Sequence, residues 1–313
     1  MATALDILLI VVGLALAIAG SEIAVRYTRS LAARLGAPAF LVGVVLVALG
    51  TDLPEIANSI AAHLQDAGDV NVGDSIGSTL TQYTFVLGLF PLVIAVIAVS
   101  RRQVAIVTAL TVCGLGLTAL LTSDGHLGRP DGLALVGAWA VATVVVVRTV
   151  GGHVVEDPPE TRLRGIGAQV AVVLGSLAVV GLGATVAVRS LVDVAESLGV
   201  PEFALAFFGA SLGTSAPEIA VDLTALARGA PAIALGDALG SSLIDATLSI
   251  GAGPIVAPAD VTPRLAVLGS LYALVAVALV GTILAVRRRH DWRSAAACIA
   301  LYLLAYVVLI GGD

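Results

Sequence analysis

The chain contains one segment twice, at a spacing of 163 residues. When residues 24–84 are laid on residues 187–247 without a gap, about 23 of the 61 positions are identical, and the best-matched stretches read LGTDLPEIA and LGTSAPEIA. Repetition of this length indicates a tandem duplication and not a chance motif. The sequence therefore predicts a molecule made of two similar halves.

Hydrophobic residues make up 58% of the 313 positions and charged residues only 12%, about half the charged share of an average soluble domain. The apolar residues fall into ten stretches of about 20 residues or more, the length that an α-helix needs to cross a bilayer. We therefore expect an all-α, multi-pass membrane protein with ten transmembrane helices. The stretches lie near residues 4–25, 38–63, 70–99, 103–122, 131–149, 165–188, 202–227, 232–257, 264–286 and 293–311.

Ten helices shared between two halves give five helices in each half. Because five is an odd number, the second half must enter the membrane upside down relative to the first, so we expect two inverted repeats, as in many secondary transporters. The polar stretch 151–164 has the proline and charge content of an exposed linker. We place the first repeat at residues 1–150 with its motif at 48–84, and the second at 165–313 with its motif at 211–247.

The arginines predict the orientation, because short cytoplasmic loops carry an excess of basic residues. With the N-terminus outside, 13 of the 16 arginines fall in inner loops, and only Arg129, Arg189 and Arg264 fall outside. We therefore expect a protein of the cell membrane with both termini extracytoplasmic and the linker 151–164 in the cytoplasm.

The first copy of the motif places a carboxylate beside a proline in the middle of an apolar stretch. A proline inside a helix removes one N–H donor, so Pro54 frees the carbonyl of Gly50 and loosens Thr51. Free carbonyls at membrane depth are tolerated only where they line protein or a water-filled cavity. Glu55 adds a carboxylate at the same place.

The second copy repeats this arrangement with Pro217 beside Thr214 and Glu218. Carboxylate and carbonyl oxygens are the ligands of a hard cation, and Ca²⁺ accepts six to eight of them in flexible geometry. The absence of His and Cys nearby argues against zinc and copper. Because acids inside a membrane usually serve function, and these two are duplicated with matching flanks, we interpret Glu55 and Glu218 as cation ligands.

The next helix of each half carries a polar stripe on one face, because its polar side chains recur every fourth residue. Glycines beside the stripes allow close helix packing, so these helices are expected to converge near the midplane. Asp74 and Asp237 each follow a glycine, and both helix capping and site lining remain open for them. The stripes are Asp74, Ser78 and Gln82 in the first half and Asp237, Ser241 and Asp245 in the second.

The remaining polar residues of the apolar stretches are given less specific roles. Glu22 and Asp222 could belong to an access path for ions, but we expect both to reach water. The histidines fall in predicted loops without a carboxylate pair at ligand spacing, so we expect all four to be solvated: His63, His126, His153 and His290.

The pair GTDLPE and GTSAPE, each followed by GDSIGSTLTQ or GDALGSSLID, resembles the two alpha-repeats of the calcium/cation antiporter superfamily, of the prokaryotic sodium/calcium exchanger type. The resemblance covers essentially the whole chain. It implies ten helices with the N-terminus outside, and Ca²⁺ and Na⁺ as transported ions without a cofactor. It also implies that Glu55 and Glu218 bind both ions, and that further ligands are Thr51, Thr214, Ser78, Ser215, Ser241 and Asp245.

Three features depart from the pattern of that family. Asp52 stands where the family usually has Ser, Gln82 stands where it usually has Asn, and the common Gly-Asn pairs are Gly-Asp at Asp74 and Asp237. Asp52 adds a carboxylate where a neutral Na⁺ ligand is expected. Both Na⁺ and H⁺ therefore remain open as the coupling ion.

A pocket of several carboxylates cannot cross the membrane uncompensated, because each bare charge there costs about 3 kcal/mol or more. One Ca²⁺ or several Na⁺ or H⁺ would neutralise it, and competition for one site produces antiport. We therefore predict a secondary active antiporter that exchanges Ca²⁺ for Na⁺ by alternating access, with H⁺-coupled exchange of Ca²⁺ or another divalent cation as the alternative. The partners are then inorganic cations and the lipid bilayer, with no enzymatic activity, no nucleic acid, and a monomer sufficient.

The sequence supports two other functions less well. A passive cation channel needs carboxylate rings or carbonyl filters but no alternation between states. An intramembrane aspartyl protease is suggested by the duplicated Gly-Asp pairs, but Asn71 and Ala234 exclude the Gly-x-Gly-Asp pattern.

Overall fold

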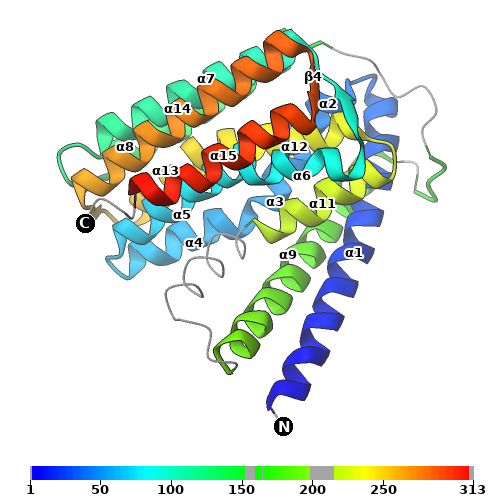
Figure 1. Cartoon of the computed structure of the whole chain (residues 1–313), viewed down its shortest axis with the longest axis horizontal. Helices are drawn as coiled ribbons and strands as arrows, with labels where there is room; N and C mark the ends of the chain where they lie inside the picture. Colours follow the sequence, from blue (N-terminus) through cyan, green and yellow to red (C-terminus); the bar gives the residue numbers. More distant parts are fainter. Residues whose placement is uncertain (1, 152–158, 164, 198–214, 310–313) are drawn as a thin grey trace. The chain divides into compact units, whose positions relative to one another are not determined.

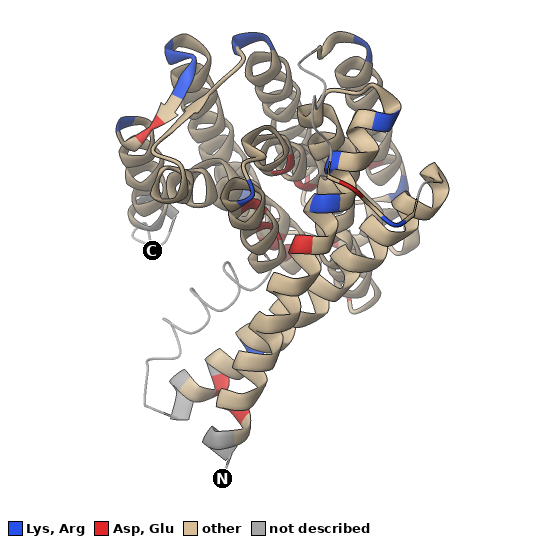
Figure 2. Cartoon of the chain, turned by 90° about the vertical axis from the view of Figure 1, so that its right-hand side faces the viewer, with Lys and Arg blue, Asp and Glu red and all other residues tan. Residues whose placement is uncertain are grey.

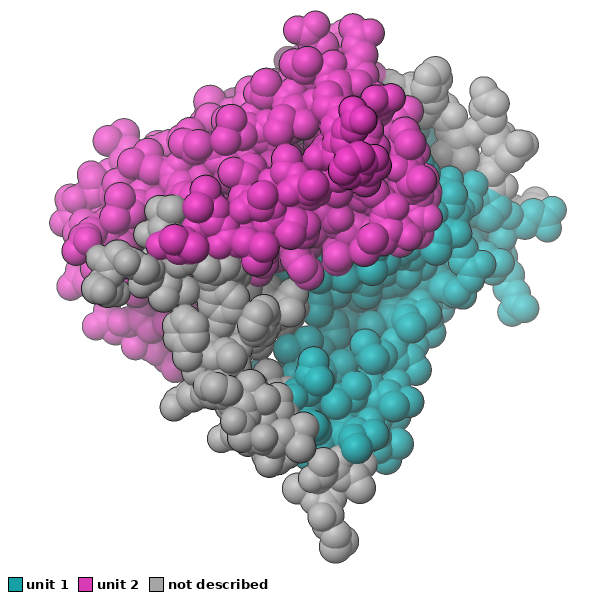
Figure 3. Space-filling view, in the orientation of Figure 1, with its two compact units in different colours: residues 1–51, 152–237 teal, residues 52–151, 238–313 magenta. Residues whose placement is uncertain are grey.

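A computed structural model of the chain describes residues 2–151, 159–163, 165–197 and 215–309. The described residues are mostly helical, as the composition predicts. They divide into two compact units, which Figure 3 shows in separate colours: unit 1 comprises Met1–Thr51 and Gly152–Asp237, and unit 2 comprises Asp52–Gly151 and Ala238–Asp313. Each unit therefore takes segments from both halves of the sequence.

Unit 1 is built around two long helices, α1 (Ala2–Leu35) and α9 (Ile166–Ser197), which lie side by side (Figure 1). They lie close together at Gly13 and Gly183, where a Cβ on Gly13 would lie 2.5 Å from the carbonyl oxygen of Gly183. Only glycine allows this contact. The other elements of unit 1 are α2 (Ala39–Val42), the π-helical turn η1 (Gly43–Val47), α3 (Ala48–Thr51), α11 (Ala216–Ala227) and the first half of α12 (Pro231–Ile244).

Unit 2 contains a larger group of helices, in which α7 packs along α14, α13 packs against α4 and α8, and α15 packs against α6. Figure 1 shows α7 and α14 lying side by side. These elements are α4 (Leu53–Leu64), α5 (Gly68–Thr81), η2 (Gln82–Val86), α6 (Leu87–Val93), α7 (Arg101–Leu121), α8 (Arg129–Thr149), the second half of α12, η3 (Asp245–Ser249), α13 (Ile250–Val256), α14 (Pro263–Arg287) and α15 (Trp292–Leu309).

Two short antiparallel strand pairs connect loops of unit 2. Strand β1 (Val96–Ala98) pairs with β4 (Arg289–Asp291), and β2 (His126–Leu127) pairs with β3 (Ala259–Asp260). Each pair joins a strand from the first half of the sequence to one from the second half.

The described residues contain seven helices long and apolar enough to cross a membrane, and eight if the broken pair Ala39–Thr51 and Leu53–Leu64 forms one span. Trp292–Ala305 is a shorter apolar helix. Each of these segments overlaps a stretch predicted from the sequence, so the chain is a multi-pass helical membrane protein. The predicted stretch 202–227 begins outside the described residues, and the total of ten helices stays a prediction.

Several local features recur at the spacing of the sequence repeat. The residue before each Pro-containing helix has nearly the same backbone conformation, with φ −82° and ψ 3° at Asp52 and φ −84° and ψ 4° at Ser215. The duplication therefore extends to backbone geometry. Two other pairs recur in the same way, the starts of π-helical turns at Gln82 and Asp245 and the prolines within helices at Pro91 and Pro254.

Candidate cation-binding residues

The interruption predicted at Pro54 is present in the structure. Helix α3 ends at Thr51 and α4 begins at Leu53, so Asp52 stands between the two helices. Pro54 lies in the first turn of α4, where its missing N–H interrupts no hydrogen bond within that helix. The break brings Asp52 and Glu55 into the interior, where both side chains are at most 1% exposed.

Four carboxylates of unit 2 are close enough to interact electrostatically: Asp52, Glu55, Asp74 and Asp245. Asp52, Glu55 and Asp245 are buried, and Asp74 is half-buried. We call these four residues the acidic cluster. Several like charges out of contact with water are strongly unfavourable unless cations or protons compensate them. The acidic cluster therefore has the chemistry of a site that takes up positive charge.

The cluster is only partly supplied with hydrogen-bond donors. The amide of Asn58 donates to Asp74 at 2.6 Å, and the hydroxyls of Ser78 and Ser249 donate to Asp245, the latter at 3.2 Å. Both oxygens of Glu55, in contrast, are buried without a hydrogen-bond partner among the residues that the structure describes. Buried polar atoms are normally hydrogen-bonded, so this exception points to a ligand.

Neither Asp74 nor Asp237 caps a helix. Asp74 is the seventh residue of α5 and Asp237 the seventh residue of α12, and both lie well inside their helices. Of the two roles left open by the sequence, capping is therefore wrong.

The last residue of each polar stripe begins a π-helical turn, Gln82 in η2 and Asp245 in η3. Two residues further on, the hydroxyls of Thr84 and Thr247 donate at 2.5 Å to the carbonyl oxygens four residues back, and thereby compete with the backbone for these acceptors. Single π-helical turns are frequent at functional sites. We did not predict these turns from the sequence, where the repeated threonine is the only signal that could have indicated them.

Unit 1 holds a second group of buried polar residues. Ser215, Glu218, Asp222 and Asp237 are 0% exposed, and Thr51 is 1% exposed. Ser215 and Glu218 stand at the start of α11, in the positions that Asp52 and Glu55 occupy at the start of α4. The predicted ligand Ser241 is also fully buried, in the part of α12 that belongs to unit 2. The predicted ligand Thr214 lies outside the described residues.

Asp222 does not reach water, contrary to our expectation. Its carboxyl group lies beside that of Asp237, and the hydroxyl of Thr51 lies 3.4 Å from Asp237 Oδ1. Because an ionised carboxylate is only an acceptor, two carboxyl groups can form a hydrogen bond only when they share a proton. Glu22, in contrast, is exposed as expected and pairs with Arg228.

The expectation of a solvated His63 is wrong, because His63 is 2% exposed and belongs to a hydrogen-bonded chain. Pro254 leaves the carbonyl of Ile250 without its helical partner. The amide nitrogen of Asn71 lies 3.1 Å from this carbonyl and 3.0 Å from His63 Nε2. His63 Nδ1 in turn lies 2.7 Å from the carbonyl of Ala257.

His290 in β4 was also expected to be solvated, and this expectation is wrong because its side chain is fully buried. Pro91 frees the carbonyl of Leu87, and His290 Nε2 lies 2.6 Å from it. Burial lowers the pKa of His290. His126 is exposed as expected, and its hydrogen bond with Asp260 raises its pKa. His153 lies outside the described residues.

Known proteins resemble this chain over most of its length. It is 29% identical over 264 residues to the putative antiporter CaxA of Alkalimonas amylolytica, with 80% of each chain covered. It is 23% identical to the sodium/calcium exchanger MaX1 of Methanosarcina acetivorans, with 82% of this chain and 84% of the relative covered. These relatives are named as transporters and not as enzymes.

The fold is similar to solved structures of the sodium-calcium exchanger NCX_Mj. One of them, soaked with Na⁺ and Sr²⁺, matches with a TM-score of 0.81 at 22% identity and covers 99% of both chains. The model of the family described as sodium/calcium exchanger protein matches residues 5–148 and again residues 168–311. The resemblance found in the two motifs is thereby confirmed: the chain belongs to the sodium/calcium exchanger protein family.

Proposed function

We propose that this protein is a secondary active antiporter that exchanges Ca²⁺ for Na⁺ across the cell membrane by alternating access. The observation that carries the proposal is the acidic cluster, in which Glu55 is buried with both oxygens unpartnered among the described residues. Such oxygens suit Ca²⁺, which prefers several carboxylate and carbonyl ligands. Family membership and the relatives named as exchangers support the same class of transport.

The ligands that we propose follow the duplicated motifs. Glu55 and Glu218 are the principal carboxylates and bind both ions. Asp245 is a further acidic ligand, and Gln82 supplies the amide oxygen at the corresponding position of the first repeat. The remaining proposed ligands are Thr51, Asp52, Ser78, Thr214, Ser215 and Ser241.

Exchange follows from the cost of moving the buried charges. Each uncompensated carboxylate at membrane depth costs about 3 kcal/mol or more, so the empty site does not switch between the two sides. One Ca²⁺ or several monovalent cations remove this barrier. We propose that the first helix of each inverted repeat moves against the remaining eight helices, with both termini extracytoplasmic and residues 151–164 as a cytoplasmic linker.

H⁺-coupled exchange is the second candidate, and Asp52 favours it. This carboxylate lies in the acidic cluster, within electrostatic reach of Glu55 and Asp245. Crowded carboxylates bind protons more readily than isolated ones. A site of this kind has the means to exchange a divalent cation for protons.

Uptake of ⁴⁵Ca²⁺ into liposomes containing the purified protein tests both candidates. One set of liposomes holds an outward Na⁺ gradient, a second an outward H⁺ gradient, and a third neither gradient. Uptake driven by Na⁺ supports the proposal, and uptake driven only by H⁺ replaces it with the second candidate. Equal uptake without a gradient would indicate a channel, and liposomes containing Glu55→Gln protein provide the matched control.

A further inference from the structure

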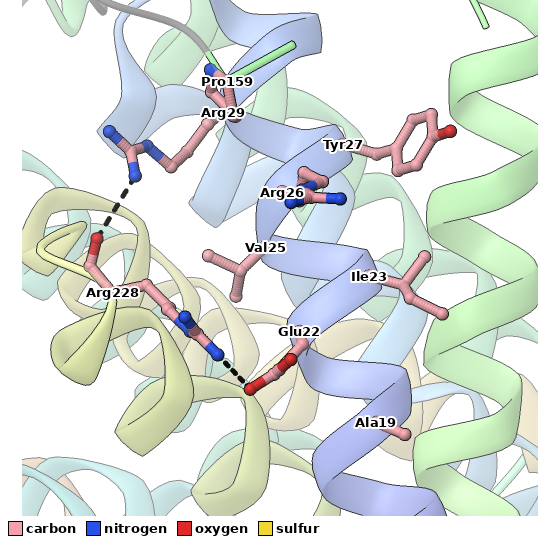
Figure 4. Close-up of a pocket in the computed structure, with 9 residues that line it drawn as sticks. All are labelled: Ala19, Glu22, Ile23, Val25, Arg26, Tyr27, Arg29, Pro159 and Arg228. Atoms are coloured by element: carbon pink, nitrogen blue, oxygen red, sulfur yellow. Dashed lines mark hydrogen bonds and ion pairs between the residues drawn. The ribbon is translucent and has the colours of Figure 1, made fainter. Parts of the chain in front are cut away.

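A pocket of about 490 Å³ lies on unit 1, beside the C-terminal part of α1 and the end of α11 (Figure 4). Among the residues that the structure describes, three arginines line it, Arg26 and Arg29 from α1 and Arg228 from the turn after α11, together with one carboxylate, Glu22. None of these residues belongs to the proposed cation site. The pocket is of the size that small-molecule sites usually have.

The charges of the described lining residues do not balance. Arg228 forms an ion pair with Glu22, and Arg29 donates a hydrogen bond to the backbone carbonyl of Arg228 at 3.2 Å, both drawn in Figure 4. Arg26 has no ion-pair partner among the described residues. Among the described lining residues, three guanidinium groups therefore face one carboxylate. The fork of donors on a guanidinium group suits phosphate oxygens, which it binds in a bidentate manner.

The pocket lies at the level of α1 where exposed apolar side chains are followed by arginines. Helix α1 has 34 residues and a length of about 51 Å, which exceeds the hydrocarbon thickness of about 30 Å. Figure 2 shows its basic residues along the C-terminal part only. Directly before them, Ile18 and Ile23 expose 55% and 45% of their surface, as residues in contact with lipid chains do. Ile23 also lines the pocket.

We propose that this pocket binds the phosphate group of an anionic phospholipid. Arg26, Arg29 and Arg228 are the phosphate ligands, and the acyl chains lie along Ile18 and Ile23. Glu22 is the internal competitor, because it occupies Arg228 when no lipid is bound. A water-soluble anion would use the arginines but would gain nothing from the apolar surface beside them.

Binding of a fluorescent phosphatidylglycerol to the purified full-length protein in neutral detergent tests this proposal. Each arginine near a membrane surface strengthens anionic lipid binding about fivefold, so the double variant Arg26→Gln with Arg29→Gln is expected to weaken it about 30-fold. Glu22→Gln is expected to tighten binding about fivefold, since it removes the competing charge. Arg102→Gln, an exposed arginine of unit 2, is the matched control and leaves binding unchanged.

Competition identifies the ligand. Unlabelled phosphatidylglycerol should displace the probe, whereas phosphatidylcholine and inorganic phosphate should require far higher concentrations. If inorganic phosphate competes as well as the lipid, the site takes a soluble anion and the lipid assignment is wrong. If Arg102→Gln weakens binding as much as the double variant, or if Glu22→Gln does not tighten it, the pocket is not the lipid site. Size-exclusion chromatography of each variant verifies that it is folded.

Discussion

The two copies of the motif share a backbone but place their additional carboxylate differently. Residues 48–59 read ALGTDLPEIANS, and residues 211–222 read SLGTSAPEIAVD. Both helices begin in the same way after Asp52 and Ser215, and each copy carries one acid besides its glutamate. In the first copy that acid precedes the proline, and in the second it is Asp222, four residues after the glutamate. The duplication has therefore kept the geometry and redistributed the charge.

The consequence is visible at Asp74 and Asp237, which correspond to each other. Asp74 accepts a hydrogen bond from the neutral amide of Asn58, whereas Asp237 lies beside a second carboxyl group, that of Asp222. The additional acid of the first copy, Asp52, instead joins the acidic cluster. We infer that the first copy contributes additional charge to cation binding, and that the second holds its additional acid in a pair with Asp237.

The comparison is most severely tested at the glutamates, which both copies retain. If both are principal ligands, Glu55→Gln and Glu218→Gln should each reduce Ca²⁺ uptake about 100-fold or more, because removing a buried charge from its partner costs about 3 kcal/mol. Uptake of ⁴⁵Ca²⁺ into liposomes measures the effect, with the exposed linker variant Glu160→Gln as control. Full transport by either variant would contradict the assignment of that glutamate.

Asp52→Ser gives the first copy the residue that the second copy has at Ser215. The acidic cluster then loses one carboxylate next to Glu55 and Asp245, so fewer protons are needed to neutralise it. We expect the ratio of the Ca²⁺ uptake rates at pH 8 and pH 6 to be about tenfold smaller for the variant than for the unmodified protein. We also expect uptake by the variant to depend more strongly on the Na⁺ gradient. Identical Na⁺ and pH profiles for the variant and the unmodified protein would show that Asp52 does not take part in coupling.

The sequence predicted the buried acids because proline and glutamate in an apolar stretch have few structural explanations. It predicted the helix break at Pro54 for the same reason, since the effect of proline is local. It did not predict the burial of His63 and His290, because the carbonyls of Ala257 and Leu87, which contact their rings, are far away in the sequence and belong to the backbone. The division into two units could not be predicted either, because contacts between helices that are distant in the sequence leave no periodic pattern in it.

The carbonyls freed by Pro91 and Pro254 extend the comparison to stability. His290 forms a hydrogen bond with the carbonyl freed by Pro91, and Asn71 forms one with the carbonyl freed by Pro254. The corresponding residues of the other copy are Leu127 and Ala234, whose side chains have no polar group. His290→Leu and Asn71→Ala should each lower the free energy of unfolding by about 1–3 kcal/mol, because a buried carbonyl loses its donor.

Thermal unfolding of the purified variants in detergent measures these losses. His290→Gln retains an N–H donor and should recover part of the stability. If His290→Leu unfolds at the same temperature as the unmodified protein, the carbonyl of Leu87 does not depend on the histidine.

The smallest effect is expected where the second copy is given the chemistry of the first. Asp222→Asn places an amide beside Asp237, as Asn58 stands beside Asp74, so a hydrogen bond can form without a shared proton and the free energy of unfolding should change by less than about 1 kcal/mol. Asp222→Ala removes the donor and should cost about 1–3 kcal/mol. Thermal unfolding distinguishes the two variants. Equal losses would mean that Asp222 stabilises unit 1 by filling space and not by donating a hydrogen bond, and the contrast between the two copies would then be one of packing.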